Sequence, residues 1–148
     1  MVRFGIVGTN TISEWFAGAC RATDGRAEAV AVCSRDVGRA RAFADKVGAT
    51  DAFADLATMA ESVDAVYIAS PNGLHRDQAV LAAEAGRHVL VEKAMGASLS
   101  EVQSIFAAAE RTGVVAMEAM RNVHTPAHQL IRDTLPRLGT LRHARFEK

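Results

Sequence analysis

The stretch "VRFGIVGTNTIS", residues 2–13, decides the fold. Residues 2–7 form a short run of apolar and β-branched side chains, which is typical of a buried strand. The turn residues Gly8, Thr9 and Asn10 follow at once, and residues 12–22 then carry apolar side chains at helical spacing. The stretch therefore predicts a strand that runs through a tight turn into a helix.

The same alternation of strand and helix continues along the chain. Strands and helices alternating in this way predict an α/β fold: a Rossmann-type, doubly wound parallel sheet covered on both faces, in three layers. The further strands are predicted at residues 27–33, 65–69, 88–92 and 114–118, and the further helices at 37–47, 74–85 and 100–112.

Signals for helix ends support these boundaries. Asp36 and Ser100 are predicted to cap the starts of two helices, because their side-chain oxygens can accept backbone N–H groups. Gly48, Gly86 and Gly113 stand where three helices should end.

The composition limits the class of protein. The chain has 148 residues, 49% of them hydrophobic, which is enough to bury one sizeable core. Its 17 basic and 17 acidic side chains balance, so no field would gather nucleic acid or an anionic membrane, and neither partner is expected. Cys20 and Cys33 lack metal-ligand spacing, and no signal peptide or long apolar run is present. A cytoplasmic protein with reduced thiols is predicted.

The first turn resembles the glycine-rich turn that holds a dinucleotide pyrophosphate. Such a turn lets the backbone approach the phosphates, while the N-terminal amides of the next helix face their charge. Aligned on Gly8, the pattern G-x-G-x-x-G has Asn10 and Ser13 at the second and third glycine positions. Asn tolerates a left-handed backbone, and Ser is small enough for close packing. An ordinary strand-to-helix turn remains the alternative to cofactor binding.

The end of the second strand is where a dinucleotide fold binds the adenosine ribose. Ser34 and Arg35 stand at this place, and Arg39 follows one helical turn later. Two guanidinium groups and a hydroxyl suit a 2′-phosphate, so NADP is the expected cofactor. Asp36 is close enough to keep NAD as an alternative. An exposed basic helix start without a ligand is the other interpretation.

Two longer stretches resemble one family. In "YIASPNGLHRDQAVLAAEAGRHVLVEKAM", residues 67–95, a predicted strand ends in S-P-N-x-x-H and the next ends in E-K. This resembles the glucose-fructose oxidoreductase, inositol dehydrogenase and rhizopine-catabolism (Gfo/Idh/MocA) family, whose strands end in T/S-P-N-x-x-H and E-K-P. "GVVAMEAMRNVHTPAHQLIRD", residues 113–133, resembles the passage out of that family's cofactor domain. Some members also begin with a G-T-N turn.

The resemblance implies an NAD(P)-dependent oxidoreductase that transfers hydride between nicotinamide and a sugar, polyol or related alcohol or carbonyl substrate. Within the implied cofactor site, the residues up to Ile12 would line the pyrophosphate, those from Ser34 to Arg39 the ribose, and the rest the nicotinamide side. The implied cofactor-binding residues are Gly8, Thr9, Asn10, Thr11, Ile12, Ser34, Arg35, Arg39, Ser70, Pro71, Asn72, His75, Glu92 and Lys93.

Lys93 is the implied catalytic residue. Its amine can donate a proton to the substrate oxygen, or accept one, while hydride moves at the adjacent carbon. Ala94 stands where the family has proline, so the backbone restriction that a proline imposes on its neighbour is missing. Ala94 in place of proline is therefore expected to affect the position of the Lys93 amine more than the binding of the cofactor. A solvated lysine at a strand end is the alternative.

Other polar residues after the last predicted strand are interpreted more simply. Arg121 and His124 are expected to approach the substrate or a further domain. Glu118, His124 and His128 suggest a metal site, but spacing fixes no third ligand and Pro126 leaves the helical register open, so no metal is expected.

The chain is predicted to divide at residue 120. Residues 1–120 would form the NAD(P)-binding Rossmann domain. Residues 121–148 would form a connecting helix from about Pro126 and then the first strand of a C-terminal α/β domain that is otherwise absent, with Phe146, Glu147 and Lys148 opening that strand. Family members have such a second domain over the nicotinamide, which implies a homo-oligomer formed through it. The isolated chain is expected to bind cofactor better than it turns over substrate.

Two other functions remain open. A sensor or regulatory protein could keep this fold without catalysis, and Ala94 leaves room for it, whereas Glu92 and Lys93 favour an enzyme. A structural domain with a decayed site is supported only by the two missing glycines. On the first helix, Trp15 and Phe16 are predicted to be packing residues.

Overall fold

The protein is described by a computed structural model, which covers residues 1–145 of the chain. Its centre is a six-stranded sheet with the order β3-β2-β1-β4-β5-β6, in which every neighbouring pair is parallel. The direction of winding reverses between β1 and β4, and ligands of such sheets bind at the carboxyl ends of the strands beside this point. The strands are β1 (Val2–Val7), β2 (Ala27–Cys33), β3 (Asp51–Phe53), β4 (Ala65–Ile68), β5 (His88–Val91) and β6 (Ala116–Glu118).

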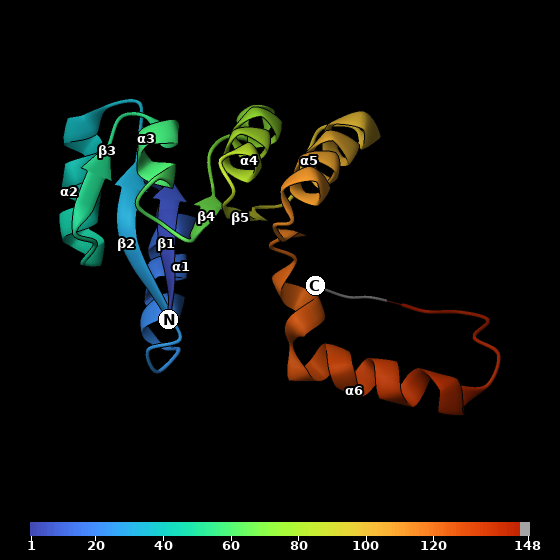
Figure 1. Cartoon of the computed structure of the whole chain (residues 1–148). Coiled ribbons are helices and arrows are strands. Elements are labelled where there is room, and N and C mark those ends of the chain that lie inside the picture. Colours follow the sequence, from blue (N-terminus) through green and yellow to red (C-terminus); the bar gives the residue numbers. More distant parts are fainter. Residues whose placement is uncertain (146–148) are drawn as a thin grey trace.

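Helices cover both faces of the sheet, as Figure 1 shows. One buried cluster joins α1 and α2 to the sheet, and a second joins α3, α4 and α5 to its other face. These two clusters make the three layers, and the predicted Rossmann-type fold is confirmed. The helices of this part are α1 (Thr11–Arg21), α2 (Val37–Val47), α3 (Leu56–Ala60), α4 (His75–Glu84) and α5 (Leu99–Thr112), with a 3₁₀ turn at Asn72–Leu74.

The sequence missed two short elements, β3 and α3. They have three and five residues, which is too short for a hydrophobic period to be read. The cap of α5 also differs from the prediction: Ser98, not Ser100, accepts the N–H of Glu101. Ser98 and Glu101 form the S-x-x-E pattern of a helix start, and Ser100 lies inside the first turn. Asp36, Gly48 and Gly113 cap their helices as predicted.

The segment after the sheet lacks a core of its own. A 3₁₀ turn (Arg121–His124), α6 (Pro126–Thr134) and another 3₁₀ turn (Leu135–Leu138) follow one another, and no side chain from residue 121 to residue 145 is buried. Figure 1 shows α6 standing apart from the sheet. Its Leu130 is 68% exposed.

The predicted final strand is not formed over its described part, residues 140–145. A strand needs a paired neighbour to satisfy its backbone, and the described six-stranded sheet does not include these residues. The residues predicted to open that strand, 146–148, lie outside the described part. The assignment of residues 121–148 to the start of a second domain stays a prediction.

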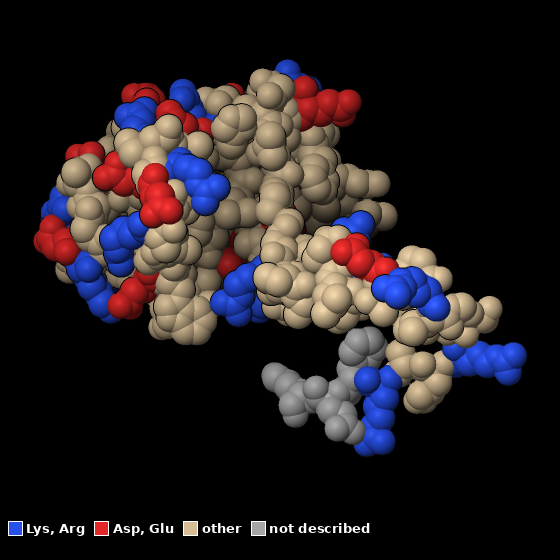
Figure 2. Space-filling view, turned by 90° about the horizontal axis from the view of Figure 1, so that it is seen from below, with Lys and Arg blue, Asp and Glu red and all other residues tan. Residues whose placement is uncertain are grey.

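The surface carries both signs of charge. On the face seen in Figure 2, basic and acidic side chains are intermingled over the sheet and its helices. Among residues 1–145, no helix is both long enough and apolar enough to span a bilayer.

Candidate active site

The turn at residues 8–13, called the cofactor turn below, begins with a glycine that no other residue can replace. Gly8 has φ of 110°, in the region that side chains rarely adopt. A Cβ atom on Gly8 would lie 2.7 Å from the carbonyl oxygen of Ala69, which follows β4. The turn thus packs directly against backbone at the carboxyl end of the sheet.

Asn10 caps α1. Its Oδ1 accepts the N–H of Ser13 at 3.0 Å, and its Nδ2 donates to the Ala69 carbonyl at 2.6 Å. With φ of −111° and ψ of 178°, Asn10 is extended, so the idea that it replaces glycine by adopting a left-handed backbone is wrong. The residue instead stabilises the helix start. Ser13 is fully buried, as the expectation of close packing required.

The beginning of α1 is open to solvent at this edge of the sheet. Thr9 is half-buried, and Thr11 and Ile12 are exposed. The first N–H groups of a helix have no partners within it, and their partial positive charge attracts anions. The cofactor turn therefore has the features that a pyrophosphate needs: a close backbone approach at Gly8 and an open helix start.

The predicted ribose-binding residues lie together after β2. The Nε of Arg39 donates to the Ser34 hydroxyl at 3.0 Å, so two of the three predicted residues are in contact. Arg35 is exposed and forms no ion pair among the described residues. Asp36 caps α2 by accepting the Arg39 N–H at 2.9 Å, which engages the carboxylate that would otherwise favour NAD.

The turn after β4 brings Ser70, Pro71 and Asn72 to the same edge of the sheet. Pro71 and Asn72 are exposed, and the Ser70 hydroxyl donates to the side chain of Gln78 on α4. His75 differs from this group. It is 0% exposed, and its placement beside the cofactor stays a prediction. Its ring lies beneath the turn, because it begins α4 and points into the interior.

Glu92, Lys93, Ala94 and Met95, called the lysine turn below, follow β5. The Tyr67 hydroxyl donates to one oxygen of Glu92 at 2.7 Å, and the Lys93 N–H donates to the other at 3.3 Å. The Lys93 side chain is exposed and makes no ion pair among the described residues. The peptide bond between Lys93 and Ala94 is cis.

Tyr67 is a buried partner of this turn. Burial, together with the hydrogen bond to Glu92 and the charge of Glu92, raises the pKa of the Tyr67 phenol well above its usual range. The phenol therefore remains a hydrogen-bond donor, and it holds the Glu92 carboxylate. The Phe16 ring stacks on Tyr67 at a centroid distance of 3.8 Å, which confirms the packing role of Phe16.

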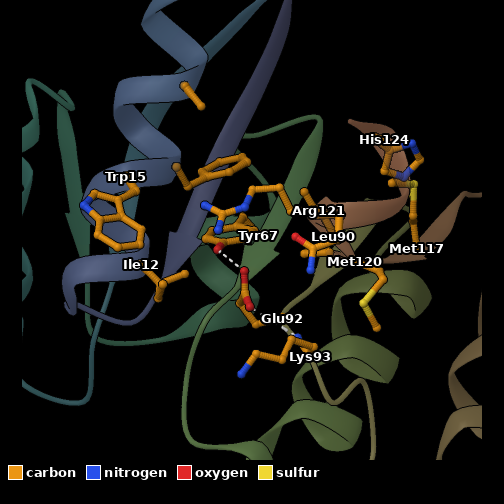
Figure 3. A pocket seen from close by; sticks show the side chains of 14 residues that line it. Ile12, Trp15, Tyr67, Leu90, Glu92, Lys93, Met117, Met120, Arg121 and His124 are labelled. Atoms are coloured by element: carbon orange, nitrogen blue, oxygen red, sulfur yellow. Dashed lines mark hydrogen bonds between the residues drawn. The ribbon is translucent and has the colours of Figure 1, made fainter. Parts of the chain in front are cut away.

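A pocket of about 480 Å³ opens beside the lysine turn, on the α1 face of the sheet. In Figure 3, Ile12 and Trp15 enter it from α1, Tyr67, Glu92 and Lys93 lie at its centre, and Arg121 enters from the segment after β6. Most of the lining is apolar, and Tyr67 and Glu92 form a hydrogen-bonded pair within it. The lining residues are Ile12, Trp15, Phe16, Ala19, Tyr67, Leu90, Glu92, Lys93, Met117, Ala119, Met120, Arg121, Asn122 and His124.

The sequence predicted only part of this pocket. Trp15, predicted to be a packing residue, is 58% exposed and lines the pocket, so that prediction is wrong. The spacing of residues along a helix predicts which side chains share a face of that helix. It does not predict which part of the sheet beside the helix is left without a covering helix. Tyr67 was missed because it reads as an ordinary strand residue. Arg121 and His124 also line the pocket, and their approach to a substrate or a further domain stays a prediction.

Among residues 1–145, no group of three or more His, Cys, Asp or Glu side chains is arranged to hold a metal ion. Glu118, one of the three residues considered for such a site, instead accepts the N–H of Met95 at 2.8 Å. That contact ties the lysine turn to β6.

Comparison with known proteins agrees with the geometry. A sequence profile described as an oxidoreductase family with an NAD-binding Rossmann fold matches residues 2–120. The scyllo-inositol 2-dehydrogenase (NADP(+)) of Bacillus subtilis is 43% identical over 144 residues, which are 96% of this chain and 44% of that enzyme.

Solved structures give the same result. The WlbA dehydrogenase of Bordetella pertussis, in complex with NADH and UDP-GlcNAcA, has a TM-score of 0.83 and 32% identity over 92% of this chain and 42% of that one. The 3-ketoreductase KijD10 of Actinomadura kijaniata, with TDP-benzene and NADP, has a TM-score of 0.84 and 30% identity, over 92% of this chain and 43% of that one.

The fold and the cofactor turn thus define the class: a dinucleotide-binding domain of the oxidoreductase type. The chain belongs to the Gfo/Idh/MocA oxidoreductase family, with its NAD-binding Rossmann fold at residues 2–120. It spans less than half the length of the relatives it matches.

Proposed function

We propose that this chain is the cofactor-binding domain of an NADP-dependent oxidoreductase, which transfers hydride between nicotinamide and a CH–OH or carbonyl carbon of a sugar or polyol. One observation carries the proposal: the exposed amine-bearing side chain of Lys93 lines the pocket at the carboxyl end of β5, beside Glu92. This is the edge of the sheet at which the cofactor turn also lies.

The residues present fit a dinucleotide. Gly8 leaves the space that a Cβ would fill, and the open start of α1 would bind the pyrophosphate. Ser34, Arg35 and Arg39 would bind the adenosine ribose and its 2′-phosphate. The bound nicotinamide would supply or accept the hydride. NADP is favoured over NAD because the nearest carboxylate, Asp36, is engaged as a helix cap while Arg35 is free to pair.

Lys93 would handle the proton of the reaction. As the substrate carbonyl becomes an alcohol, its oxygen needs a proton, and the Lys93 amine can donate it and stabilise the negative charge that develops. In the opposite direction the neutral amine would accept that proton. Glu92, held by Tyr67, would orient the backbone of Lys93 through its N–H.

The pocket suits a ring compound with hydroxyl groups. The C–H face of a sugar or cyclitol can lie on apolar walls such as Trp15 and Met120, while its hydroxyls reach Glu92, Arg121 and Asn122. The named relatives support this class, since one acts on scyllo-inositol and another structure holds a nucleotide sugar.

The proposal also includes the partners of the chain and its location in the cell. The chain would act on its small-molecule substrate together with a C-terminal domain, which would also form a homo-oligomer. The cytoplasm is the proposed location, consistent with two buried cysteines that form no disulfide.

Cofactor binding is tested first by calorimetric titration of the chain with NADPH and NADH at matched ionic strength. Tighter NADPH binding is expected, and Arg35→Ala with Arg39→Ala should weaken NADPH about tenfold or more while sparing NADH. Arg41→Ala is the matched control, because Arg41 is also on α2 but pairs with Asp45. Unchanged preference in the double variant would refute the 2′-phosphate assignment.

The catalytic role needs the full-length protein. Lys93→Met should lower kcat about 100-fold to 10,000-fold with NADPH affinity retained. Lys46→Met, in which the lysine removed pairs with Glu14 on another part of the surface, should leave kcat unchanged. Full turnover in Lys93→Met would exclude proton transfer by this amine, whereas a wild-type protein that binds NADPH and turns over no substrate would favour a sensor.

A further inference from the structure

His75 is a buried side chain that the proposed reaction does not use. It is 0% exposed and, with Ser13, is one of the two buried polar side chains among the described residues. Burying an imidazole is costly unless its nitrogens are hydrogen-bonded. The contacts of the ring therefore indicate what it does.

Each ring nitrogen contacts a different turn. Nε2 lies 2.8 Å from the carbonyl oxygen of Ser70, in the turn after β4. Nδ1 lies 2.8 Å from the carbonyl oxygen of Ala94, in the lysine turn after β5. Both distances are those of good hydrogen bonds. The two strands are neighbours in the sheet, so the ring spans the gap between the loops that leave them.

The chemistry of the two partners limits how the ring can satisfy both contacts. Both partners are carbonyl oxygens, which only accept hydrogen bonds. A neutral imidazole has a single N–H and can make only one of these bonds, whereas a ring with two N–H groups makes both.

No carboxylate on the neighbouring segments contacts the ring in the described part of the chain. Two basic side chains stand on the segments that the ring joins: Arg76, which follows His75 and pairs with Asp77, and Lys93 on the lysine turn, and both are exposed. The carboxylates are engaged elsewhere: Asp77 with Arg76, Glu92 with Tyr67, and Glu118 with the Met95 N–H.

We infer that His75 is a positioning residue that carries two ring protons and joins the turn after β4 to the lysine turn, and so sets where Lys93 stands relative to the cofactor. It acts through the carbonyl of Ala94, the residue that follows Lys93. The effect of His75 on the reaction rests on the proposed function of Lys93. The bridge, which is the pair of hydrogen bonds from the ring to the carbonyls of Ser70 and Ala94, does not depend on that function.

The bridge is tested in the unmodified chain by nitrogen-15 NMR of its histidine rings at neutral pH. The expected result is a directly bonded proton on both ring nitrogens of His75, protected from solvent exchange. His88→Gln assists assignment, because His88 is exposed and its Nδ1 accepts the N–H of Val115, so it carries no proton there. A bare nitrogen on His75 would mean that one turn is not held, and would overturn the inference.

The positioning role is tested in the full-length protein with His75→Gln. Since a misplacement of about 1 Å can cost about 100-fold in rate, kcat per NADPH-binding site should fall about 10-fold to 100-fold. The Kd for NADPH should change less than kcat, because the ring contacts the Ser70 backbone but neither the cofactor turn nor the residues after β2. The control His88→Gln should change neither quantity.

The outcomes separate the two proposals. If His75→Gln lowers only the melting temperature, with kcat per binding site unchanged, His75 is merely structural and the positioning role is wrong. If Lys93→Met retains full turnover, the proposed role of Lys93 fails, while two ring protons on His75 would still establish the bridge.

Discussion

The cofactor turn and the lysine turn lie at the same edge of the sheet, yet they are held in different ways. In the cofactor turn, the cap that starts α1 joins residues only three apart, Asn10 and Ser13. The side-chain contacts that hold the lysine turn come from 19 to 25 residues away in the sequence: His75 to Ala94, Glu118 to Met95, and Tyr67 to Glu92. The cofactor turn therefore combines a local cap with a contact from Asn10 to the distant Ala69, whereas the lysine turn depends on side-chain contacts from neighbouring parts of the assembled sheet.

The largest expected effect breaks the cofactor turn. In Gly8→Val, the backbone at φ of 110° is strained and the new Cβ meets the Ala69 carbonyl, so the free energy of unfolding should fall by about 3 kcal/mol. NADPH binding should be lost. Denaturant unfolding and calorimetry measure the two effects. Gly25→Val has a similar φ of 78° with nothing within 4 Å, so it should cost less and spare binding. Equal losses in both variants would contradict the role of the close approach.

The next variant tests the Asn10 cap of α1 separately from the close approach of Gly8 to Ala69. Asn10→Ala removes the acceptor of the Ser13 N–H and the donor to Ala69, so the free energy of unfolding should fall by about 1–2 kcal/mol. NADPH affinity should fall as well, because the helix start moves. Ser98→Ala removes the corresponding cap of α5, far from this turn, and should lower stability alone. If NADPH binds Asn10→Ala as well as wild type, the cap serves only the fold.

A smaller effect isolates the lysine turn. Tyr67→Phe keeps the stack on Phe16 but removes the hydrogen bond to Glu92, at a cost in stability of about 1 kcal/mol. In the full-length protein kcat should fall about fivefold, the rate equivalent of that energy, with NADPH affinity unchanged. Steady-state kinetics measures kcat, and calorimetry on the same preparation measures the affinity for NADPH. Loss of NADPH binding instead would show that the two turns are coupled.

The last prediction concerns the pH dependence of stability that the two buried thiols, Cys20 and Cys33, produce. Burial raises the pKa of Cys20 and of Cys33 from 9.0 to about 11. The unfolded chain therefore loses these protons first, so stability is fully present below pH 9 and is lost as the pH rises toward 11. Unfolding at pH 8 and pH 10 should differ by about 1 kcal/mol for each thiol. In the double variant Cys20→Ala with Cys33→Ala, the free energy of unfolding should differ less between pH 8 and pH 10. If the double variant still loses as much stability between these pH values, other titrating groups cause the loss.

The sequence predicted the sheet and its longer helices because their signal is periodic. The bounds of β1, β2 and α2 agree with the prediction, and β4, β5 and α5 differ by one residue. Only β3 and α3 were missed, since elements of three and five residues are shorter than a readable period.

The site was predictable only where its chemistry is local. Gly8 and the group after β2 follow from their place in the strand-turn-helix order, and Ser34 and Arg39 do meet. The burial of His75 and the bond from Tyr67 to Glu92 depend on which strands become neighbours, β4 beside β5, which spacing along the chain does not encode. Trp15 was misassigned for the same reason, because the open face beside it exists only in the folded sheet.

The position of Trp15 gives the protein an optical signal of its own. It is the single tryptophan of the chain, and its indole is 58% exposed on the wall of the pocket. Reduced nicotinamide absorbs near-ultraviolet light in the range where indole emits, so energy transfer would report its arrival without any added dye. A ligand that fills only the pocket would shift the emission by displacing water from the ring. The wavelength and intensity of Trp15 fluorescence in the wild-type chain would thus distinguish a ligand in the pocket from a ligand bound elsewhere.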